Sequence, residues 1–545
     1  MQKDSLHILI AAAECRGLAK VGGLADVVSD LSQALARQGV SIAVVMPYYE
    51  VVQSTAVPTI DLAVRFGDTN WRVEVFQARL GNVPVYLLQS DRFFRGKYGQ
   101  VFTDSDRLGR GPFEDDAQRF AFFSAAALEL ARHLDAARPI DVLHCHDWHT
   151  GALLMLLHHD LRYRQLAARL KTLFTIHNLD YQGVRPLELD GERPFLSFAD
   201  WFPTLYRDLK SGRGLEPFLD PRADVPCFNP MRAGIQLADR VNTVSPTYAA
   251  EITRPDDPAR NFVGGRGLER DLARLFEQGR LDGILNGLDY AAHDPNKLDP
   301  PFDAHSDGWQ AAKRAHKTDL LSRLPHHLGQ MRERLGARFK NRDALSGKLS
   351  TYQAEEWLQR PLVVAVTRAV SQKVSVLLES MPGGAPLFQA MLEREMSLII
   401  MGTGGLEGQL EAINDGANGL FVCAFDPLFA QRLYTAGELF LMPSDFEPCG
   451  ISQLVAMRYG CLPLVHDIGG LRDTVHDGQT GFAYGGADRP AARQALLHTL
   501  DRALDVYCQP EKWAAMQAAA MQARFEWGDS ARQYIRLYRQ LLARG

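Results

Sequence analysis

The sequence predicts an α/β protein made of two doubly wound domains that face a cleft. With 545 residues the chain exceeds the roughly 250–300 residues at which a single hydrophobic core stops growing. Short apolar runs typical of buried parallel strands recur along both halves, and helical stretches separate them. Ligands of such open sheets bind beyond the carboxyl ends of the strands, so we expect the functional site in the cleft.

The first half begins with a β-α-β pattern. The apolar run at 7–14 predicts a buried strand, and the stretch "AKVGGLADVV" (19–28) leads from it into a helix. In that helix Val27, Leu31 and Leu35 recur every four residues, and Gly39 stands at the expected C-cap. Further strands are predicted at 40–49, 83–89, 141–147 and 171–178.

The second half repeats the alternation after a polar segment. Segment 291–360 is rich in Lys, Arg and His, and we interpret it as a solvated helical connector or insertion. It separates an N-terminal domain (1–290) from a C-terminal one (361–525), which a final helix (526–545) follows. The strands of the second domain are predicted at 360–368, 396–405, 418–425, 437–445 and 461–470.

Composition excludes several classes of protein. A net charge of −5 gives no sign of nucleic acid or an anionic membrane as a partner. The seven cysteines are scattered without a C-x-x-C pair, which favours reduced thiols over a disulfide framework. The N-terminal apolar run is too short for a signal peptide, and no 18-residue apolar stretch occurs. We therefore expect a soluble cytoplasmic protein.

The glycine loop at 19–28 has two interpretations. Glycines let backbone N–H groups approach a ligand, and Lys20 with the following helix N-terminus would favour an anion. The alternative is a tight turn with an incidental surface lysine. "GGLAD" at 22–26 reappears as "GGLRD" at 469–473, again between a strand and a helix, so both domains could present such a turn.

Histidines mark the ends of two predicted strands. His144, His146, Asp147 and His149 lie in "DVLHCHDWHTG" (141–151). A metal is disfavoured because no nearby carboxylate or cysteine cluster completes a ligand set. We favour a sugar-binding edge that includes Trp148. His177 likewise ends a strand, and this placement favours a position in the cleft over a core histidine.

Charged residues follow two strands of the second domain. Arg368 and Lys373 share the loop after the first strand, and two cations there suit a diphosphate. A solvated loop with basic residues is the alternative. Glu447 stands at an apparent helix start, where a carboxylate either stabilises the helix dipole or accepts sugar hydroxyls.

Taken together, these motifs resemble the bacterial glycogen synthase and plant starch synthase family. The resemblance runs in order along most of the chain. It implies two Rossmann-like domains in the GT-B arrangement, with a C-terminal helix (530–542 here) crossing back onto the first. It further implies a retaining ADP-glucose:α-1,4-glucan glucosyltransferase, which extends the non-reducing end without a metal or other cofactor. The motifs are "KVGGLADVV", "HCHDWHTG", "TIHNLDYQG", "NTVSPTYAAEI", "GILNGLDY", "TRAVSQK", "MPSDFEPCGISQLVAMRYG" and "GGLRDTV".

The resemblance assigns site residues by position. It implies that His177, Arg368, Lys373 and Glu447 are catalytic: His177 beside the transferred glucose, Arg368 and Lys373 on the leaving diphosphate, and Glu447 in the glucose-binding turn. We expect front-face substitution assisted by the leaving phosphate, because the sequence names no carboxylate nucleophile. The implied substrate-binding residues are Lys20, Gly22, Gly23, Asp26, Asp147, Trp148, His149, Asn178, Asn286, Phe425, Cys449, Gly450, Gly469 and Gly470.

Two positions depart from the family pattern. Val374 stands where a glycine usually follows the lysine, and Ile468 replaces the threonine of a Thr-Gly-Gly turn. These changes put the donor and the rate in question, but not the fold. Two alternatives therefore remain: a related transferase that uses UDP-glucose or a small acceptor, and a non-catalytic glucan-binding protein. The sequence does not predict the oligomeric state.

Overall fold

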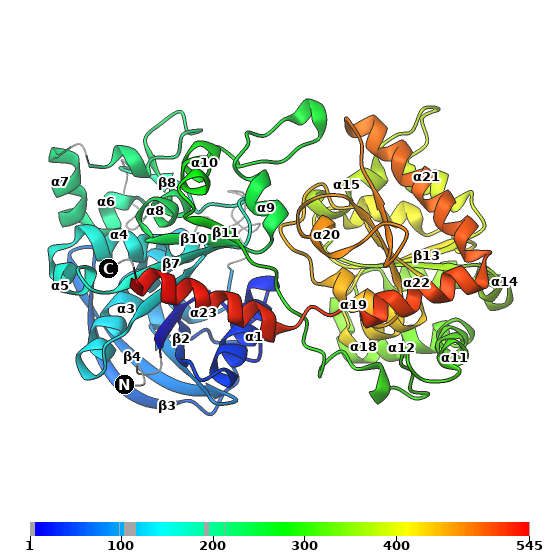
Figure 1. Cartoon of the computed structure of the whole chain (residues 1–545), viewed down its shortest axis with the longest axis horizontal. Helices are drawn as coiled ribbons and strands as arrows, with labels where there is room; N and C mark the ends of the chain where they lie inside the picture. Colours follow the sequence, from blue (N-terminus) through cyan, green and yellow to red (C-terminus); the bar gives the residue numbers. More distant parts are fainter. Residues whose placement is uncertain (1–5, 97–98, 103–115, 190–195, 213, 544–545) are drawn as a thin grey trace. The chain divides into compact units, whose positions relative to one another are not determined.

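The computed structural model describes residues 6–96, 99–102, 116–189, 196–212 and 214–543 (Figure 1). The chain divides into two compact units. The first comprises Met1–Asp256, Gly264–Gly287 and Trp527–Gly545, and the second comprises Asp257–Val263 and Leu288–Glu526.

The first unit is built on a sheet with strand order β11-β10-β7-β6-β1-β2-β5-β4-β3. The strands from β11 to β5 run parallel. The apolar runs predicted β1, β2, β5, β6 and β7, but not β10 and β11. All of β6 is buried, so both faces of the sheet are covered there. The bounds are β1 (His7–Ala11), β2 (Ser41–Pro47), β3 (Val57–Phe66), β4 (Thr69–Leu80), β5 (Val83–Gln89), β6 (Val142–His146), β7 (Lys171–Ile176), β10 (Arg240–Thr243) and β11 (Leu281–Gly283).

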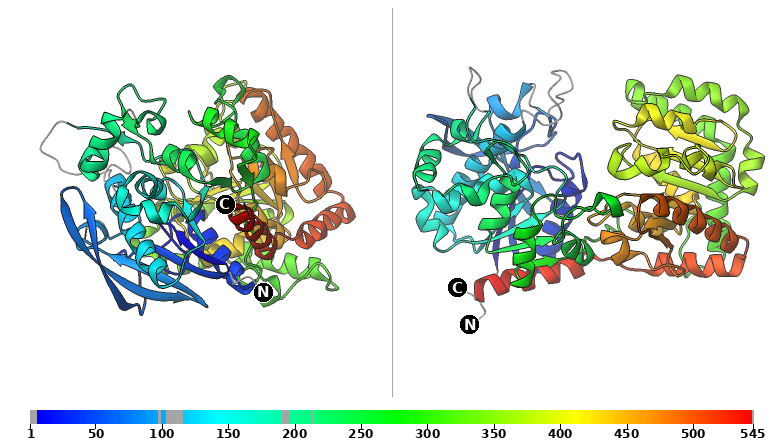
Figure 2. Two further views of the ribbon diagram at one scale, coloured as in Figure 1. Left: turned by 60° about the vertical axis from the view of Figure 1, so that its left-hand side comes forward. Right: turned by 90° about the horizontal axis from the view of Figure 1, so that it is seen from above.

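An antiparallel hairpin at one edge of this sheet was not predicted. β3 and β4 pair across a two-residue turn in which Gly67 has a φ of 62° (Figure 2). Alternate residues of β3 from Leu62 to Phe66 are buried and those between them are exposed. The hairpin therefore has one solvated face, which parallel strands covered on both faces do not have.

Helices surround the sheet of the first unit, and one of them comes from the far end of the chain. α23 (Trp527–Ala543) lies beside α1 (Figure 1) and buries Tyr534, Tyr538 and Leu541. The C-terminal helix thus belongs to the first unit. The other main helices are α1 (Gly23–Arg37), α3 (Asp116–Ala137), α4 (Gly151–His159), α7 (Pro203–Ser211), α8 (Pro230–Leu237), α9 (Pro246–Glu251) and α10 (Glu269–Glu277).

The second unit contains a fully parallel sheet with strand order β14-β13-β12-β15-β16-β17. Its predicted strands are all present, and β12 is buried along its whole length. The strands are β12 (Leu362–Val366), β13 (Ser397–Met401), β14 (Gly419–Val422), β15 (Leu439–Met442), β16 (Leu462–His466) and β17 (Phe482–Tyr484). The helices that alternate with them are α15 (Ser371–Leu378), α16 (Leu387–Leu392), α18 (Pro427–Ala436), α19 (Ser452–Arg458), α20 (Gly469–Thr474), α21 (Arg489–Tyr507) and α22 (Pro510–Gln522).

Segment 291–360, interpreted above as a solvated connector, packs into the second unit. The buried ammonium of Lys313 donates to the carbonyl oxygens of Thr435, Gly437 and Tyr459, each at 2.9 Å. Charged side chains in this segment thus bind the backbone of the unit, which a count of polar residues does not reveal. Its helices are α11 (Trp309–Ser322), α12 (Leu324–Leu335), α13 (Arg342–Lys348) and α14 (Ala354–Gln359).

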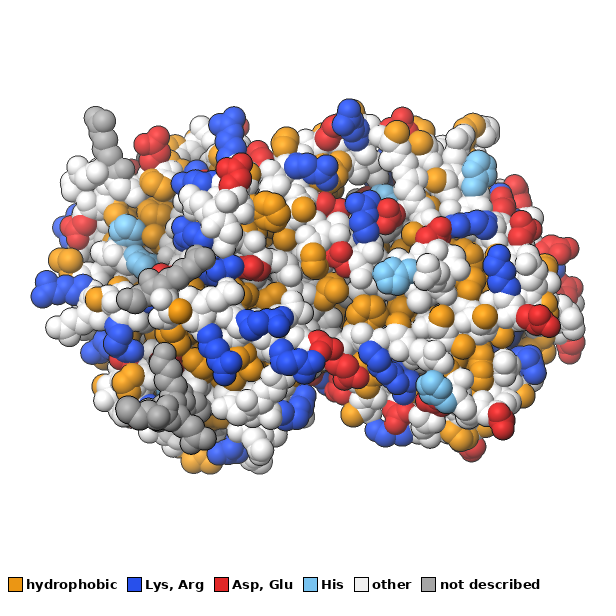
Figure 3. All heavy atoms as spheres, viewed as in Figure 1, with side chains coloured by type: hydrophobic (Ala, Val, Ile, Leu, Met, Phe, Trp, Pro, Cys, Tyr) orange, Lys and Arg blue, Asp and Glu red, His pale blue; other side chains and the backbone are white. Residues whose placement is uncertain are grey.

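The surface carries charges of both signs. On the face shown in Figure 3, Lys and Arg side chains are interspersed with Asp and Glu over each unit, in keeping with the net charge of −5. Within the described part of the chain, every helix is too short or too polar to cross a membrane.

Candidate active site

The residues predicted for the site follow the carboxyl ends of parallel strands, in two groups. Those of the first unit follow β1, β6, β7 and β11, and those of the second follow β12, β14, β15 and β16. β1 lies between β6 and β2, and β12 lies between β13 and β15, so the strand order reverses at each. Open α/β sheets bind ligands at such switch points. Each unit therefore presents one half-site.

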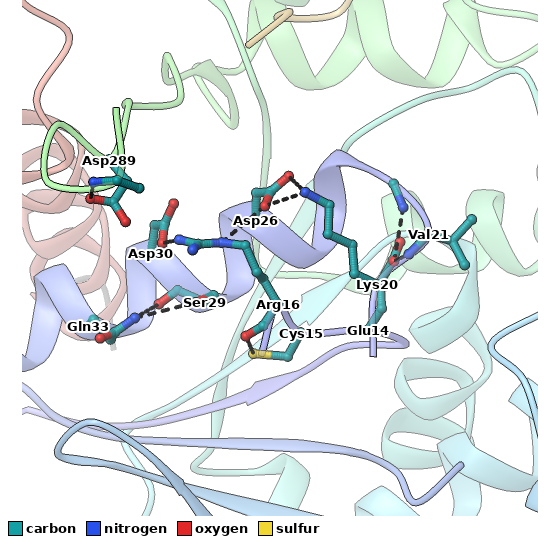
Figure 4. Close-up of polar contacts among 12 residues, drawn as sticks. Glu14, Cys15, Arg16, Lys20, Val21, Asp26, Ser29, Asp30, Gln33 and Asp289 are labelled. Carbon is teal, nitrogen blue, oxygen red and sulfur yellow. Dashed lines mark hydrogen bonds and ion pairs between the residues drawn. The ribbon is translucent and has the colours of Figure 1, made fainter. Parts of the chain in front are cut away.

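A buried carboxylate holds the glycine loop between β1 and α1. Glu14 is 4% exposed and accepts hydrogen bonds from the N–H groups of Val21 at 2.5 Å and Gly22 at 3.1 Å (Figure 4). Burial raises the pKa of Glu14, although these two amides act against that rise. Two backbone N–H groups of the loop that was predicted to bind an anionic ligand are thus hydrogen-bonded to Glu14. A Cβ at Gly23 would meet no heavy atom within 4 Å, so folding alone does not require glycine there.

Lys20 and Asp26 contact each other across this loop. The Lys20 Nζ lies 2.7 Å from Oδ1 and 2.6 Å from Oδ2 of Asp26, and Arg16 Nε lies 3.1 Å from the same carboxylate (Figure 4). The side chain of Lys20 is 47% exposed. Exposed ion pairs contribute only about 0–1 kcal/mol to stability, so Lys20 can exchange Asp26 for a phosphate at small cost.

Asp147 has an unusual backbone and an unusual carboxyl. Its φ of 57° and ψ of 179° lie in a region that residues other than glycine rarely occupy. Its buried Oδ1 accepts a hydrogen bond from the N–H of His177 at 2.8 Å, which ties the end of β6 to the end of β7. Burial raises the pKa of Asp147 to about 7, although the amides of His177 and Asn178 oppose the rise. Strained backbone and shifted pKa values cluster at functional sites, so both features agree with the expected role of Asp147 in substrate binding.

Trp148 and His149, which the sequence analysis placed at a sugar-binding edge, are buried. Their rings stack with centroids 4.2 Å apart, and Phe120 meets both rings edge-on. Gly183 has a φ of 72°, and a Cβ there would lie 2.2 Å from the Trp148 ring. The glycine of "YQG" thus lets the chain cross the indole. We infer that Trp148 and His149 form the wall behind the half-site.

His177 is partly exposed and pairs with a second histidine. Its Nε2 lies 2.8 Å from Nδ1 of His146, which is completely buried. Burial lowers the pKa of His177 to about 3 and that of His146 well below its ordinary value, so both rings are neutral near pH 7. Neutral His177 can donate or accept one hydrogen bond but carries no charge.

Two asparagines complete the first half-site. The Oδ1 of Asn178 accepts from the N–H of Asp180 at 2.8 Å, which orients its side chain within its own turn. Asn286 follows β11 and is 5% exposed, and its Oδ1 has no partner among the described residues. A buried acceptor without a partner is costly, so a ligand that donates to Asn286 would relieve that cost.

The second half-site contains a buried ion pair. The Lys373 ammonium contacts Oε2 of Glu447, and the two side chains are 14% and 7% exposed. Ser444 donates to the same oxygen at 3.1 Å. Arg368 is exposed and forms no ion pair with any residue the structure describes. The loop after β12 therefore supplies one available cation, Arg368, and the following helix α15 supplies one fixed cation, Lys373.

Two glycine-containing turns meet beside Glu447. The N–H of Gly470 donates to the carbonyl oxygen of Glu447 at 3.0 Å, and a Cβ at position 470 would lie 2.3 Å from the carbonyl oxygen of Cys449. Gly450 and Gly469 have φ values of 77° and 44°, which favour glycine. The turns after β15 and β16 are thus in direct contact.

The two departures from the family pattern are accommodated in different ways. Val374 is completely buried on the inner face of α15, so its methyl groups add to the core. Ile468 precedes α20 and makes no side-chain hydrogen bond to that helix. The chain therefore forms the turn without the hydroxyl that the family usually has there.

Phe425 follows β14 and is 58% exposed. The adjacent Asp426 accepts from the N–H of Phe429 at 2.7 Å, and Arg334 of α12 contacts both oxygens of Asp426 at 3.0 Å. Asn341 also accepts from the N–H of Cys423 at 2.9 Å. Segment 291–360 therefore anchors both sides of the Phe425 loop.

Several contributors to these half-sites escaped the sequence analysis. Glu14 is the first acidic residue after an apolar strand run, a signal that was available and not used. His146 was weighed as a metal ligand and as part of a sugar-binding edge, but not as a partner of His177. Arg334 sits in a segment with no recognisable motif, so no local signal points to it. Among the described residues, no group of three or more His, Cys, Asp or Glu side chains is arranged to hold a metal ion.

Comparisons with known proteins identify the family. Residues 7–274 match the starch synthase catalytic domain, and residues 360–502 match the glycosyl transferases group 1 model. The glycogen synthase of Streptococcus agalactiae is 34% identical over 98% of this chain and 100% of its own length. The chain belongs to the glycogen synthase family. The glycogen synthase of Bacillus subtilis is 32% identical and covers 99% of both chains.

Solved structures agree with this family membership. The catalytic domain of starch synthase IV from Arabidopsis thaliana is 28% identical, with a TM-score of 0.75 over 99% of this chain and 100% of its own. A sucrose-phosphate synthase from Thermosynechococcus elongatus, 18% identical with a TM-score of 0.55, shares the fold alone. The predicted α/β fold of GT-B type and the predicted family are confirmed. The chain is a glucosyltransferase of the retaining family that synthesises glycogen or starch.

Proposed function

We propose that the chain transfers glucose from ADP-glucose to the non-reducing end of an α-1,4-glucan, with retention of configuration and without a metal ion. Full-length similarity to glycogen synthases carries the proposal. The Arabidopsis starch synthase was solved bound to ADP and acarbose, and ADP is the leaving group of ADP-glucose. This match supports the choice of nucleotide.

The reaction exchanges one bond at the anomeric carbon for another. The bond from C1 to the diphosphate oxygen breaks, the bond from C1 to O4 of the acceptor glucose forms, and the O4 proton passes to the leaving diphosphate. Positive charge develops on the sugar and negative charge on the diphosphate. Fixed groups of opposite charge stabilise such a transition state strongly.

We assign the diphosphate to the half-site of the second unit. Arg368 is exposed and available for an ion pair there, and Lys373 is fixed by Glu447. In the half-site of the first unit, Lys20 is a separate candidate for binding the donor, because its partner Asp26 is easily exchanged. Such cations supply the charge that a metal ion supplies in other transferases.

We assign the transferred glucose to His177 in the half-site of the first unit; in the second unit, the turn that contains Glu447 and Cys449 is the candidate for sugar binding. His177 is neutral near pH 7, because burial lowers its pKa to about 3, so it suits a hydroxyl rather than a phosphate. Asn286 offers an unpaired carbonyl oxygen to a sugar O–H. Front-face substitution needs hydrogen bonds to the sugar and positive charge near the leaving phosphate, and the chain has candidate groups for both.

The test is release of nucleoside diphosphate from ADP-glucose and from UDP-glucose, with and without glycogen and with and without EDTA. We expect release from ADP-glucose only, dependent on glycogen and unchanged by EDTA. Preference for UDP-glucose would overturn the donor assignment, and loss of activity in EDTA would overturn metal independence. No release from either donor would indicate a protein that binds glucan without extending it.

A further inference from the structure

Three histidines form a row across β6 and the end of β7 in the first unit, and two of them, His144 and His146, are completely buried. The rings of His144 and His146 lie 4.2 Å apart between centroids, and His146 Nδ1 lies 2.8 Å from His177 Nε2. His144 also contacts α23, because its Nδ1 lies 2.8 Å from the Tyr538 hydroxyl. The C-terminal helix is thus connected to the residue assigned to the transferred glucose.

Only one assignment of donors and acceptors satisfies all the hydrogen bonds around His144. The Thr175 hydroxyl lies 2.7 Å from Asn242 Oδ1, which cannot donate, so the threonine gives its proton to that oxygen. His144 Nε2 lies 2.6 Å from the same hydroxyl and must therefore donate to it. His144 Nδ1 then carries no proton and accepts from Tyr538. Asn242 completes the chain by donating to the Tyr534 hydroxyl of α23 at 2.9 Å.

In the hydrogen bond between His146 and His177, the donor can also be assigned. His146 Nε2 is buried and has no partner among the described residues. A proton on that nitrogen would be an unpaired buried donor, which proteins avoid more strictly than an unpaired acceptor. The His146 proton therefore lies on Nδ1 and is donated to His177 Nε2. In neutral His177 the remaining proton then lies on Nδ1, for which no described residue provides a hydrogen-bond partner.

We propose that His146 is a positioning residue that holds His177 as the Nδ1–H tautomer, and that Tyr538 of α23 keeps His146 in place by fixing the ring of His144. This inference rests on the proposed function, because it assigns the Nδ1–H of His177 to a hydroxyl of the transferred glucose. The low pKa values of His144 and His177, both lowered by burial to about 3, agree with neutral rings throughout. The C-terminal helix thereby contributes to the geometry of the reaction.

Kinetics of four variants test the proposal. Asparagine at position 146 keeps an N–H donor at the δ position and leucine does not, so H146L should lower kcat roughly 10- to 100-fold with little change in the donor KM. H146N should recover most of this loss. Y538F should lower kcat to a smaller extent, because it frees the ring of His144. Y163F is the control, since the buried Tyr163 hydroxyl donates to Glu129 at 2.6 Å in the same unit; it should leave kcat unchanged.

The tautomer can be measured without any activity. In the full chain labelled with 15N-histidine, protonated and bare imidazole nitrogens resonate far apart, and loss of signals in H177A assigns those of His177. We expect a proton on His177 Nδ1 in the wild type and a mixture of tautomers in H146L. A proton on Nε2 in the wild type, or equal kcat in H146L and wild type, would overturn the proposal. A chain without transferase activity but with the expected spectrum would overturn the proposed function and leave the tautomer assignment standing.

Discussion

Lys373 and Glu447 form a buried ion pair that joins the helix after β12 to the turn after β15. These are neighbouring strands at the switch point of the second unit's sheet. The pair fixes a cation where the leaving diphosphate is proposed to lie. The pair also fixes the turn after β15, whose Glu447 carbonyl oxygen accepts a hydrogen bond from the N–H of Gly470. Loss of either side chain should therefore affect both stability and catalysis.

Neutralising one partner of this pair should destabilise the protein more than neutralising both. K373M and E447Q should each lower the free energy of unfolding by about 3–5 kcal/mol, because each leaves an uncompensated buried charge. The double variant should lose less than either single variant. Urea unfolding of all four proteins forms a double-mutant cycle. Additive losses would show that the two charges do not interact.

K373M should also lower kcat, by roughly 10²- to 10³-fold, because it removes fixed positive charge from the transition state. K340M is a matched control, since Lys340 pairs with Glu407 at an exposed position of the same unit. Its kcat should equal that of the wild type. A normal kcat in folded K373M would place the diphosphate elsewhere.

Asp147 should make stability fall as pH rises toward 7. Its folded pKa of about 7 lies above the unfolded value, so the folded state binds the proton more tightly. The protonated carboxyl makes its full contribution to the free energy of unfolding below the pKa that Asp147 has in the unfolded state. This contribution is lost as the pH rises from there through 7. Relative to D147N, the wild type should lose roughly 2–3 kcal/mol between pH 5 and pH 8.

Urea unfolding of the wild type and D147N at pH 5 and pH 8 measures this difference. Buried histidines shift stability in the opposite direction, but they do so in both proteins and cancel in the comparison. Asparagine preserves the side-chain shape and still accepts from the His177 amide. Parallel pH profiles for the two proteins would show that Asp147 is ionised throughout this range.

Lys20 should contribute to donor binding and turnover. K20A removes a cation from the loop before α1, while the carboxylate of Asp26 retains Arg16 as a partner. We expect a higher KM for the donor and a lower kcat, measured by nucleotide release. R37A removes an exposed cation from the last turn of the same helix and is the control. Unchanged turnover and donor affinity in K20A would remove this lysine from the site.

Arg334 should influence the donor through the Phe425 loop. R334A breaks the contact with both oxygens of Asp426 and frees the residue next to Phe425. We expect the donor KM to rise several-fold with little change in kcat, because Phe425 is expected among the substrate-binding residues and not among the catalytic ones. R332A on the same helix removes only an exposed pair with Asp343, 4.0 Å apart, and should be neutral. Equal KM values in both variants would contradict a role for segment 291–360 in donor binding.

The sequence predicted the parallel strands well, because residues buried on both faces form continuous apolar runs such as those of β6 and β12. It missed the β3–β4 hairpin, although the alternation in β3 and the turn at Gly67 were readable. The strand-end positions of Lys373 and His177 also followed from the pattern.

The interaction partners of these residues could not be predicted from the sequence pattern, because the partners come from distant parts of the chain. Lys373 meets Glu447 from 74 residues away, and His144 meets Tyr538 from 394 residues away. The packing of segment 291–360 against the second unit was not predicted for the same reason. Lys313 contacts the carbonyl oxygen of a residue 122 positions later, and Arg334 contacts a side chain 92 positions later.

The most direct test of the proposed function is the fate of labelled glucose from ADP-glucose. After incubation with glycogen, the polymer is isolated and digested with β-amylase, which removes maltose from the non-reducing ends of α-1,4 chains. We expect label in the polymer equal to the ADP released, and almost all of it recovered as maltose. Label that resists β-amylase, or ADP release without label in the polymer, would contradict transfer to the non-reducing end with retention.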